Sequence, residues 1–219
     1  LTVASGYLGT VDLNNRFDSY GNVLVEAGTV RFDNDSYFNG DFTQAGGNVS
    51  FGSYSNVFYG DFLQQAGVVS HLAQAYLHGN FTRTGGEMCN ASYSCFYFVL
   101  DAGSGGVQTF DAGPATGLYQ VGAFSVVTPF SQWDFLGEIR SREFRLADRS
   151  TVTIHDQVVV DDVINPSAGK EAALYGTLEI AAGAVLDARA VARYRTGLNT
   201  AIVENGVILR NALGVGFTD

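Results

Sequence analysis

The 219-residue chain carries a net charge of −10 and a single lysine, Lys170, so it lacks the basic stripe that contact with nucleic acid or an anionic membrane requires. None of its apolar runs reaches the roughly 18 residues of a membrane-spanning helix, so membrane insertion is not expected. The chain is long enough for one elongated domain with a buried core. Its 27 glycines beside 16% charged residues are typical of an exported β-rich protein.

A short phrase recurs four times near the start of the chain. Its first glycines lie 19, 20 and 19 residues apart, at Gly21, Gly40, Gly60 and Gly79. A second glycine follows each of them seven residues later, at Gly28, Gly47, Gly67 and Gly86. A fixed period of this length indicates a solenoid, in which each repeat buries its apolar face only against its neighbours.

Within each repeat the apolar residues are spaced by two, which predicts short strands rather than helices. Phe42 and Gln44, for example, flank an outward Thr43. Because Gly, Asn and Asp interrupt these strands, the sequence predicts an all-β chain folded as a parallel β-helix with coils of 19–20 residues. Strand twist favours a right-handed coil. Each repeat glycine is expected to supply a positive φ at a corner.

Alignment of the copies predicts four inward columns of stacked side chains. They are Val23, Phe42, Phe62, Phe81; Val30, Val49, Val69, Met88; Phe32, Phe51, His71; and Phe38, Phe58, Leu77. The third column makes His71 a packed, hydrogen-bonded core histidine. One repeat is a residue longer than the others, and its extra residue falls between Phe51 and Phe58, which indicates a corner.

The pattern predicts one β-solenoid domain over residues 1–219. Regular coils are expected over 1–88, a loop insertion with a cysteine pair over 89–117, and less regular coils over 118–219. In this last part Phe144–Val152 resembles Leu178–Leu186. Because the pattern starts in mid-repeat, a longer parent solenoid is expected, since an uncovered end coil is prone to aggregate.

Two kinds of modification are suggested by short motifs. Cys89 and Cys95 bracket five residues on the expected loop, so they suit a local disulfide, although reduced thiols also fit. Asn-x-Ser/Thr triplets begin at Asn34, Asn48, Asn80 and Asn90. They either carry glycans in a secreted eukaryotic protein or arise by chance in a repeat rich in Asn and Thr.

The sequence offers candidates for a metal site and for catalysis, but it favours neither. Asn22, Asp41, Asp61 and Asn80 form one column, in which the carboxylates of Asp41 and Asp61 would suit calcium. Turn chemistry, in which Asn and Asp bond local backbone, is the favoured interpretation. Asp156 and Asp162 lie too far apart on one strand for a catalytic pair, so neither catalytic residues nor a cofactor are expected.

Tyrosines recur near the expected corners and are the candidate binding residues. They are Tyr37, Tyr54, Tyr59, Tyr76 and Tyr93. Tyrosines of this kind stack on sugars or contact a partner protein. Tyrosine is also simply a good strand residue, and that alternative stays open.

The phrases Gly40–Phe51 and Gly79–Gly86 resemble the repeats of bacterial surface and secreted β-solenoid proteins of the autotransporter and adhesin type. The resemblance implies a non-catalytic structural or adhesive module, extracellular or at the cell surface, which displays loops. Its expected partners are its own copies or neighbouring solenoid segments, a carbohydrate, or a host or partner surface.

Two further function classes stay open. One is a β-helix enzyme acting on polysaccharides, or a carbohydrate-binding fibre. The other is an ice binder, although the outward column that would have to meet ice is not a regular threonine rank. This column consists of Leu24, Thr43, Leu63 and Thr82.

Overall fold

The computed structural model confirms a parallel β-solenoid: every described element is a β-strand, and the described strand pairs are parallel. The chain forms two compact units, Leu1–Val99 and Leu100–Asp219. The structure describes residues 1–52, 55–71, 74–88, 97–102, 106–113, 119–146, 150–166, 177–180, 185–187 and 193–194. In this part of the chain, no helix has the length and apolar character to cross a membrane.

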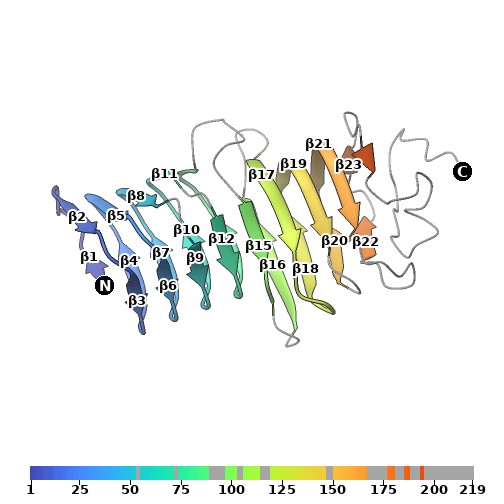
Figure 1. Ribbon diagram of the computed structural model, residues 1–219. Coiled ribbons are helices and arrows are strands. Elements are labelled where there is room, and N and C mark those ends of the chain that lie inside the picture. Colours follow the sequence, from blue (N-terminus) through green and yellow to red (C-terminus); the bar gives the residue numbers. More distant parts are fainter. Residues whose placement is uncertain are drawn as a thin grey trace, which may run out of the picture. The chain divides into compact units, whose positions relative to one another are not determined.

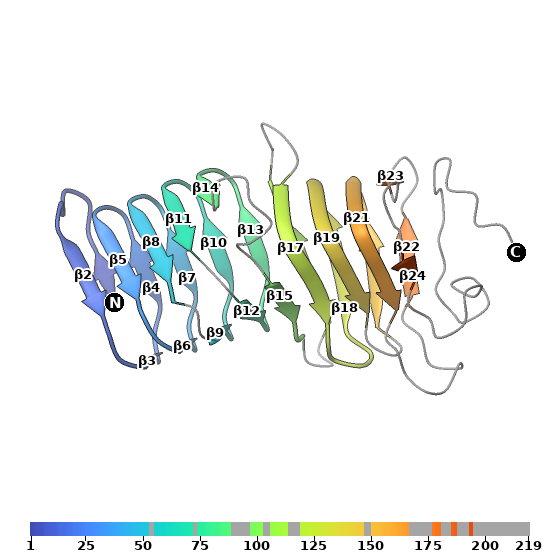
Figure 2. The ribbon, with the colours of Figure 1, turned by 45° about the horizontal axis from the view of Figure 1, so that its top comes forward.

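Each coil of the first unit has three strands that belong to three sheets. Figures 1 and 2 show the strands of successive coils side by side. Sheet A contains β1 (Thr2–Val3), β4 (Val23–Val25), β7 (Phe42–Gln44), β10 (Phe62–Gln64) and β13 (Phe81–Arg83). Sheet B contains β2 (Thr10–Leu13), β5 (Thr29–Phe32), β8 (Asn48–Phe51), β11 (Val68–His71) and β14 (Glu87–Met88). Sheet C contains β3 (Phe17–Ser19), β6 (Ser36–Phe38), β9 (Ser55–Phe58) and β12 (Gln74–Leu77). Strand β15 (Tyr97–Leu100) lies at the unit boundary.

Three of the four predicted inward columns are confirmed by the strand register. Phe42 lies between Val23 and Phe62, and these side chains are at most 1% exposed. The rings stack from coil to coil, with centroids 4.7 Å apart for Phe38 and Phe58 and 5.3 Å apart for Phe32 and Phe51. Each such side chain contributes roughly 1.5–3 kcal/mol of transfer free energy, so these columns form the core.

The prediction for His71 was wrong. A register shift between Val69 and His71 brings His71 beside Ser50 rather than Phe51, and its side chain is exposed. An imidazole among phenylalanine rings would lose its hydrogen bonds to water, so the irregularity in β11 avoids that cost. The predicted position of the extra residue is confirmed, because Phe32 aligns with Phe51 but Ser36 aligns with Asn56.

The two sets of repeat glycines serve different purposes. Gly28, Gly47, Gly67 and Gly86 have φ between 65° and 82°, as predicted. The first glycines of the repeat do not adopt a positive φ, so the prediction was wrong for them. A Cβ on Gly60 would lie 2.6 Å from the backbone carbon of Gly40, so glycine is needed there because the backbones of successive coils approach closely.

A pair of buried glutamines forms a polar ladder inside the first unit. Gln44 and Gln64 are fully buried, and Gln64 Nε2 donates to Gln44 Oε1 at 3.2 Å. Gln64 also donates to the carbonyl oxygen of Glu87 at 3.0 Å, and Gln44 donates to that of Val68 at 3.1 Å. The amides thereby satisfy backbone carbonyls where sheet A turns into sheet B.

The second unit has longer strands in two sheets. One sheet contains β16 (Val107–Asp111), β18 (Gln132–Leu136), β20 (Thr151–Ile154) and β22 (Thr177–Ile180). The other contains β17 (Tyr119–Val126), β19 (Glu138–Leu146), β21 (Gln157–Pro166) and β23 (Val185–Asp187), with β24 (Arg193–Tyr194) beside β21. Its core contains Trp133 and the rings of Phe110, Phe124, Phe135 and Phe144, all at most 1% exposed.

Two predictions about the later part of the chain need correction. The predicted loop 89–117 contains β15 and β16, because a short apolar run precedes the first glycine of this segment and an alternating strand lies between Gly106 and Gly113. Val152 aligns with Leu178 rather than with Leu186, and Leu186 aligns with Val158. A similar apolar alternation occurs in both strands of each coil, so similarity alone matched the wrong pair.

Candidate functional site

The outward side of sheet C in the first unit presents two neighbouring columns of side chains. Its three-residue strand β6 alternates inward, outward and inward, so one residue of that strand faces out. The face column, formed by the aligned outward residues, consists of Asp18, Tyr37, Val57 and Tyr76. The corner column lies two residues further along each coil and consists of Tyr20, Asn39, Tyr59 and His78.

Backbone hydrogen bonds carry the ladder of sheet C into the corner column. The N–H groups of Asn39, Tyr59 and His78 donate to carbonyl oxygens of the preceding coil at 2.9, 2.8 and 2.9 Å. Corner residues are therefore held in register although the strands have ended. The side chains of this column repeat at the coil spacing, which is about 4.8 Å for paired strands.

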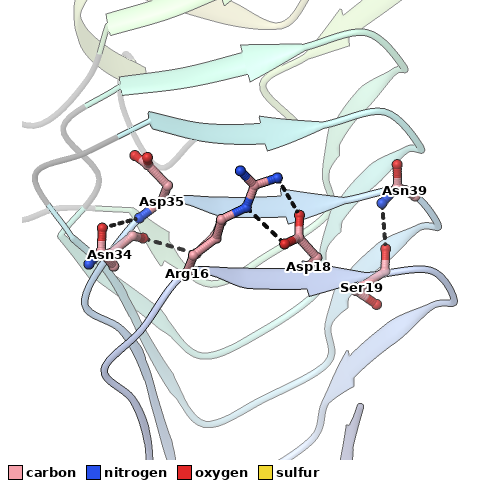
Figure 3. A network of polar contacts seen from close by, with 7 residues as sticks. Arg16, Asp18, Ser19, Asn34, Asp35 and Asn39 are labelled. Atoms are coloured by element: carbon pink, nitrogen blue, oxygen red, sulfur yellow. Dashed lines mark hydrogen bonds and ion pairs between the residues drawn. The ribbon is translucent and has the colours of Figure 1, made fainter.

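The face column combines an ion pair with two tyrosine rings. Arg16 donates two hydrogen bonds to the Asp18 carboxylate, at 2.8 and 3.0 Å, as Figure 3 shows. This hydrogen bonding holds the pKa of Asp18 below its usual value. The same guanidinium lies 4.2 Å from the centroid of the Tyr37 ring, within the range of a cation–π contact.

Part of the face column is structural. Val57 faces outward but is only 9% exposed, and its neighbours in the column are the half-buried Tyr37 and Tyr76. The two rings therefore shield Val57 from water. This packing explains why these two tyrosines are less accessible than those at the corner.

The corner column carries two exposed tyrosines, one of which is the most exposed aromatic residue among those that the structure describes. Tyr20 is 89% exposed and Tyr59 is 48% exposed. The ring of Tyr59 stacks on the imidazole of His78, with centroids 4.7 Å apart and an angle of 18° between the planes. Between the tyrosines, Asn39 donates from Nδ2 to the carbonyl oxygen of Ser19 at 2.9 Å (Figure 3).

The structure brings together three of the five predicted tyrosines. Tyr37 and Tyr76 share the face column, and Tyr59 lies in the adjacent corner column. Tyr54 and Tyr93 lie outside the described residues. Sequence reasoning did not select Tyr20 as a site residue, although a signal was present: all four corner residues directly precede the first glycine of a repeat.

The column of Asn22, Asp41, Asp61 and Asn80 forms a side-chain ladder. Its side chains bond backbone, but the backbone of the next coil rather than the local backbone of the predicted turn chemistry. The Oδ1 atoms of Asn22, Asp41 and Asp61 each accept the backbone N–H of the next column member, at 3.0, 3.0 and 2.8 Å. Asn80 Nδ2 also donates to Asp61 Oδ1, at 3.1 Å. Within the described ranges, no three His, Cys, Asp or Glu residues are grouped so as to hold a metal ion.

The candidate modification sites differ in their surroundings. Asn48 is exposed, whereas the triplet that begins at Asn34 contains the fully buried Ser36. Asn80 uses its side-chain amide in the ladder described above. Cys89, Cys95 and the triplet that begins at Asn90 lie outside the described residues, so the disulfide stays a prediction.

Comparison with protein-family models, with curated proteins and with solved structures finds no match. The fold and the candidate face therefore define only a class of protein. The chain is a β-solenoid whose first unit displays aligned aromatic and polar columns on the outside of one sheet.

Proposed function

We propose that this chain is a non-catalytic structural and adhesive module of a larger surface or secreted protein, and that it acts as a scaffold displaying outward columns and loops. The observation that supports this most directly is the use of its carboxylates. Asp41 and Asp61 accept backbone N–H groups from the next coil, as does Asp35, whose Oδ1 accepts the N–H of Ser55 at 3.0 Å.

The second unit uses carboxylates in a similar way. Asp156 accepts the N–H of Gly137 at 2.7 Å, and Asp111 accepts the N–H of Gly113 at 2.8 Å. The Oδ1 atom of Asp134 lies 3.3 Å from Nε2 of His155, and both side chains are more than one-third exposed. Acid–base catalysis needs carboxylates whose oxygens face a substrate. In this chain the carboxylates of Asp35, Asp41, Asp61, Asp111 and Asp156 accept hydrogen bonds from the chain's own backbone N–H groups instead. This use of the carboxylates favours a scaffold over an enzyme.

A scaffold of this kind is suited to adhesion through many similar, weak contacts. Parallel ladders and stacked rings fix the outward side chains at regular intervals, so a repeating partner can meet several of them at once. Linked weak contacts of this type raise the overall affinity through a high effective concentration. The acidic, lysine-poor composition and the resemblance to surface β-solenoids support an extracellular location.

The location is tested by labelling intact cells of the source organism with antibodies raised against this chain. We expect labelling of unbroken cells or recovery of the protein from the medium, and loss of the surface signal after brief protease treatment. A signal that appears only after lysis would overturn the extracellular proposal.

The absence of catalysis is tested separately, by incubating the purified chain with acidic polysaccharides and measuring new reducing ends. We expect none above the level of a heat-denatured sample. Sustained release would favour the β-helix enzyme instead.

A further inference from the structure

We propose that the corner column binds a linear, uncharged glycan that lies along the direction in which the coils stack. This inference rests on the adhesive part of the proposed function and names the chemical class of the partner. The observations that carry it are the exposure of the corner rings, their spacing, and the acidic side chains beside them, which disfavour an anionic ligand.

The tyrosines alternate between the two columns from one coil to the next. Tyr20 lies at the corner in the first of four coils, Tyr37 on the face in the second, Tyr59 at the corner and Tyr76 on the face in the last two. Tyrosines in one column are therefore two coils apart, or roughly 10 Å. A glycan in an extended, two-fold conformation repeats every second sugar over a similar length. Equivalent sugars can therefore reach Tyr20 and Tyr59, although one face of the Tyr59 ring is stacked on His78.

The residues between the rings supply neutral hydrogen-bonding groups. Asn39 is exposed, and its bond to the Ser19 carbonyl fixes the amide so that Oδ1 points away from Ser19, as Figure 3 shows. Sugar hydroxyls are recognised by such amides together with aromatic rings, which pack against the C–H faces of the sugar. A lipid or a purely apolar peptide would gain nothing from the amide placed between the tyrosines.

The charges near the column disfavour an anionic ligand. Arg16 and Asp18 neutralise one another through two hydrogen bonds. The exposed carboxylates of Asp41 and Asp61 lie two residues beyond Asn39 and Tyr59 and flank the column. The net charge of −10 on the whole chain repels polyanions such as nucleic acids and acidic polysaccharides. The exposed rings also contribute little to folding, so they can be removed without unfolding the protein.

The inference is tested by calorimetric titration of the purified chain with uncharged hexasaccharides, using the β-1,4-linked glucose, mannose and N-acetylglucosamine series. The variants are Tyr20→Ala, Tyr59→Ala and the double variant. Tyr7→Ala is the matched control, because Tyr7 is similarly exposed, at 41%, but its hydroxyl bonds the backbone of Thr10, away from both columns. Circular dichroism verifies the fold of each variant.

We expect the wild-type chain to bind at least one of the three series. Each single corner variant should weaken that binding by roughly 3- to 10-fold, which corresponds to the loss of one aromatic contact. The double variant should lose more than either single variant, and Tyr7→Ala should bind as the wild type does.

Three results would overturn the inference. They are no binding of any hexasaccharide by the folded chain, equal weakening by Tyr7→Ala, or tighter binding of polygalacturonate than of every uncharged series. If the protein is found on the cell surface but binds no glycan in this titration, the proposed function stands and only the glycan inference is overturned. A protein found only inside cells loses the proposed function whatever the titration gives.

Discussion

Strands in the first unit span two to four residues, whereas β17, β19 and β21 of the second unit span eight, nine and ten. The first unit has three strands per coil, whereas the described strands of the second unit lie in two sheets. The cores are nevertheless alike, because both contain fully buried phenylalanine rings. The difference lies in the corners rather than in the side chains that fill the coil.

The corners of the first unit bring backbones into contact. A Cβ on Gly67 would lie 2.2 Å from the carbonyl oxygen of Gly47 in the preceding coil. At Gly137, a corner of the second unit, the nearest atom would be 3.0 Å away, at the carbonyl oxygen of Gly113. Glycine-rich corners therefore allow tight, three-sided coils, and looser corners accompany longer strands.

The largest expected effect tests whether the two cores are equivalent. Phe42→Ala in the first unit and Phe135→Ala in the second should each lower the free energy of unfolding by about 3–5 kcal/mol, because both rings are fully buried among other rings. Urea unfolding measures this, with the exposed Tyr20→Ala, expected within about 0.5 kcal/mol of wild type, as the control. A cost below about 1 kcal/mol at Phe135 alone would show that the second core is packed less tightly.

The second effect separates the stability cost of a left-handed backbone conformation from the cost of close approach between the backbones of successive coils. Gly6, Gly67 and Gly137 have φ of 87°, 82° and 81°, so alanine should cost each about 1–2 kcal/mol for the left-handed conformation. Gly67→Ala should cost most, because it adds the overlap with the preceding coil, and Gly6→Ala least, because no atom lies within 4 Å of its Cβ position. Thermal unfolding of the three variants measures the order. Equal costs would mean that corner spacing does not distinguish the units.

The third effect tests the buried amide ladder of the first unit. Gln64→Met keeps a similar volume but leaves Gln44 Oε1 and the Glu87 carbonyl without this donor, so it should cost about 1–3 kcal/mol. Gln65→Met is the matched control, because Gln65 is adjacent but exposed. Unfolding in urea compares the two. A neutral result at Gln64 would mean that the ladder specifies the turn without stabilising it.

The smallest effect concerns pH. The hydrogen bonds from Arg16 hold the pKa of Asp18 below its value in the unfolded chain, so the pair stabilises the first unit above that unfolded pKa. This stability is lost as the pH falls through the folded pKa. Carboxyl-carbon NMR titration should show the pKa of Asp18 rising toward its usual value in Arg16→Ala, with Arg31→Ala as the control. An unchanged pKa of Asp18 in Arg16→Ala would show that the ion pair with Arg16 does not stabilise the Asp18 carboxylate.

The fold of this chain is predictable in detail from its sequence only where the repeat is regular. Where the phrase is complete, alternation predicted which side chains of Phe42 and its neighbours face inward, and the register confirms it. Where the phrase fades, the same reasoning missed β15 and β16 and paired Leu186 with the wrong strand. The predicted inward position of His71 was wrong for a related reason, since a local irregularity in β11 reverses the alternation that the prediction assumes.

The candidate site was only partly predictable. Its tyrosines are visible in the sequence, but the partial shielding of Val57 by its neighbours and the stacking of Tyr59 on His78 are contacts between different coils. Tyr20 is not among the five candidate tyrosines, although it directly follows the end of a strand, as the candidate Tyr59 does. Its position directly before a repeat glycine is the signal that relates it to Tyr59.

The sequence by itself determined the coil length, the parallel β-solenoid and three of the four inward columns of the first unit, because these follow from a fixed period and from strand alternation. Only the tertiary structure decided why each glycine is needed, how the carboxylates are used, and which outward side chains form one face. These depend on atoms about 20 residues away in the chain that meet only when one coil stacks on the next.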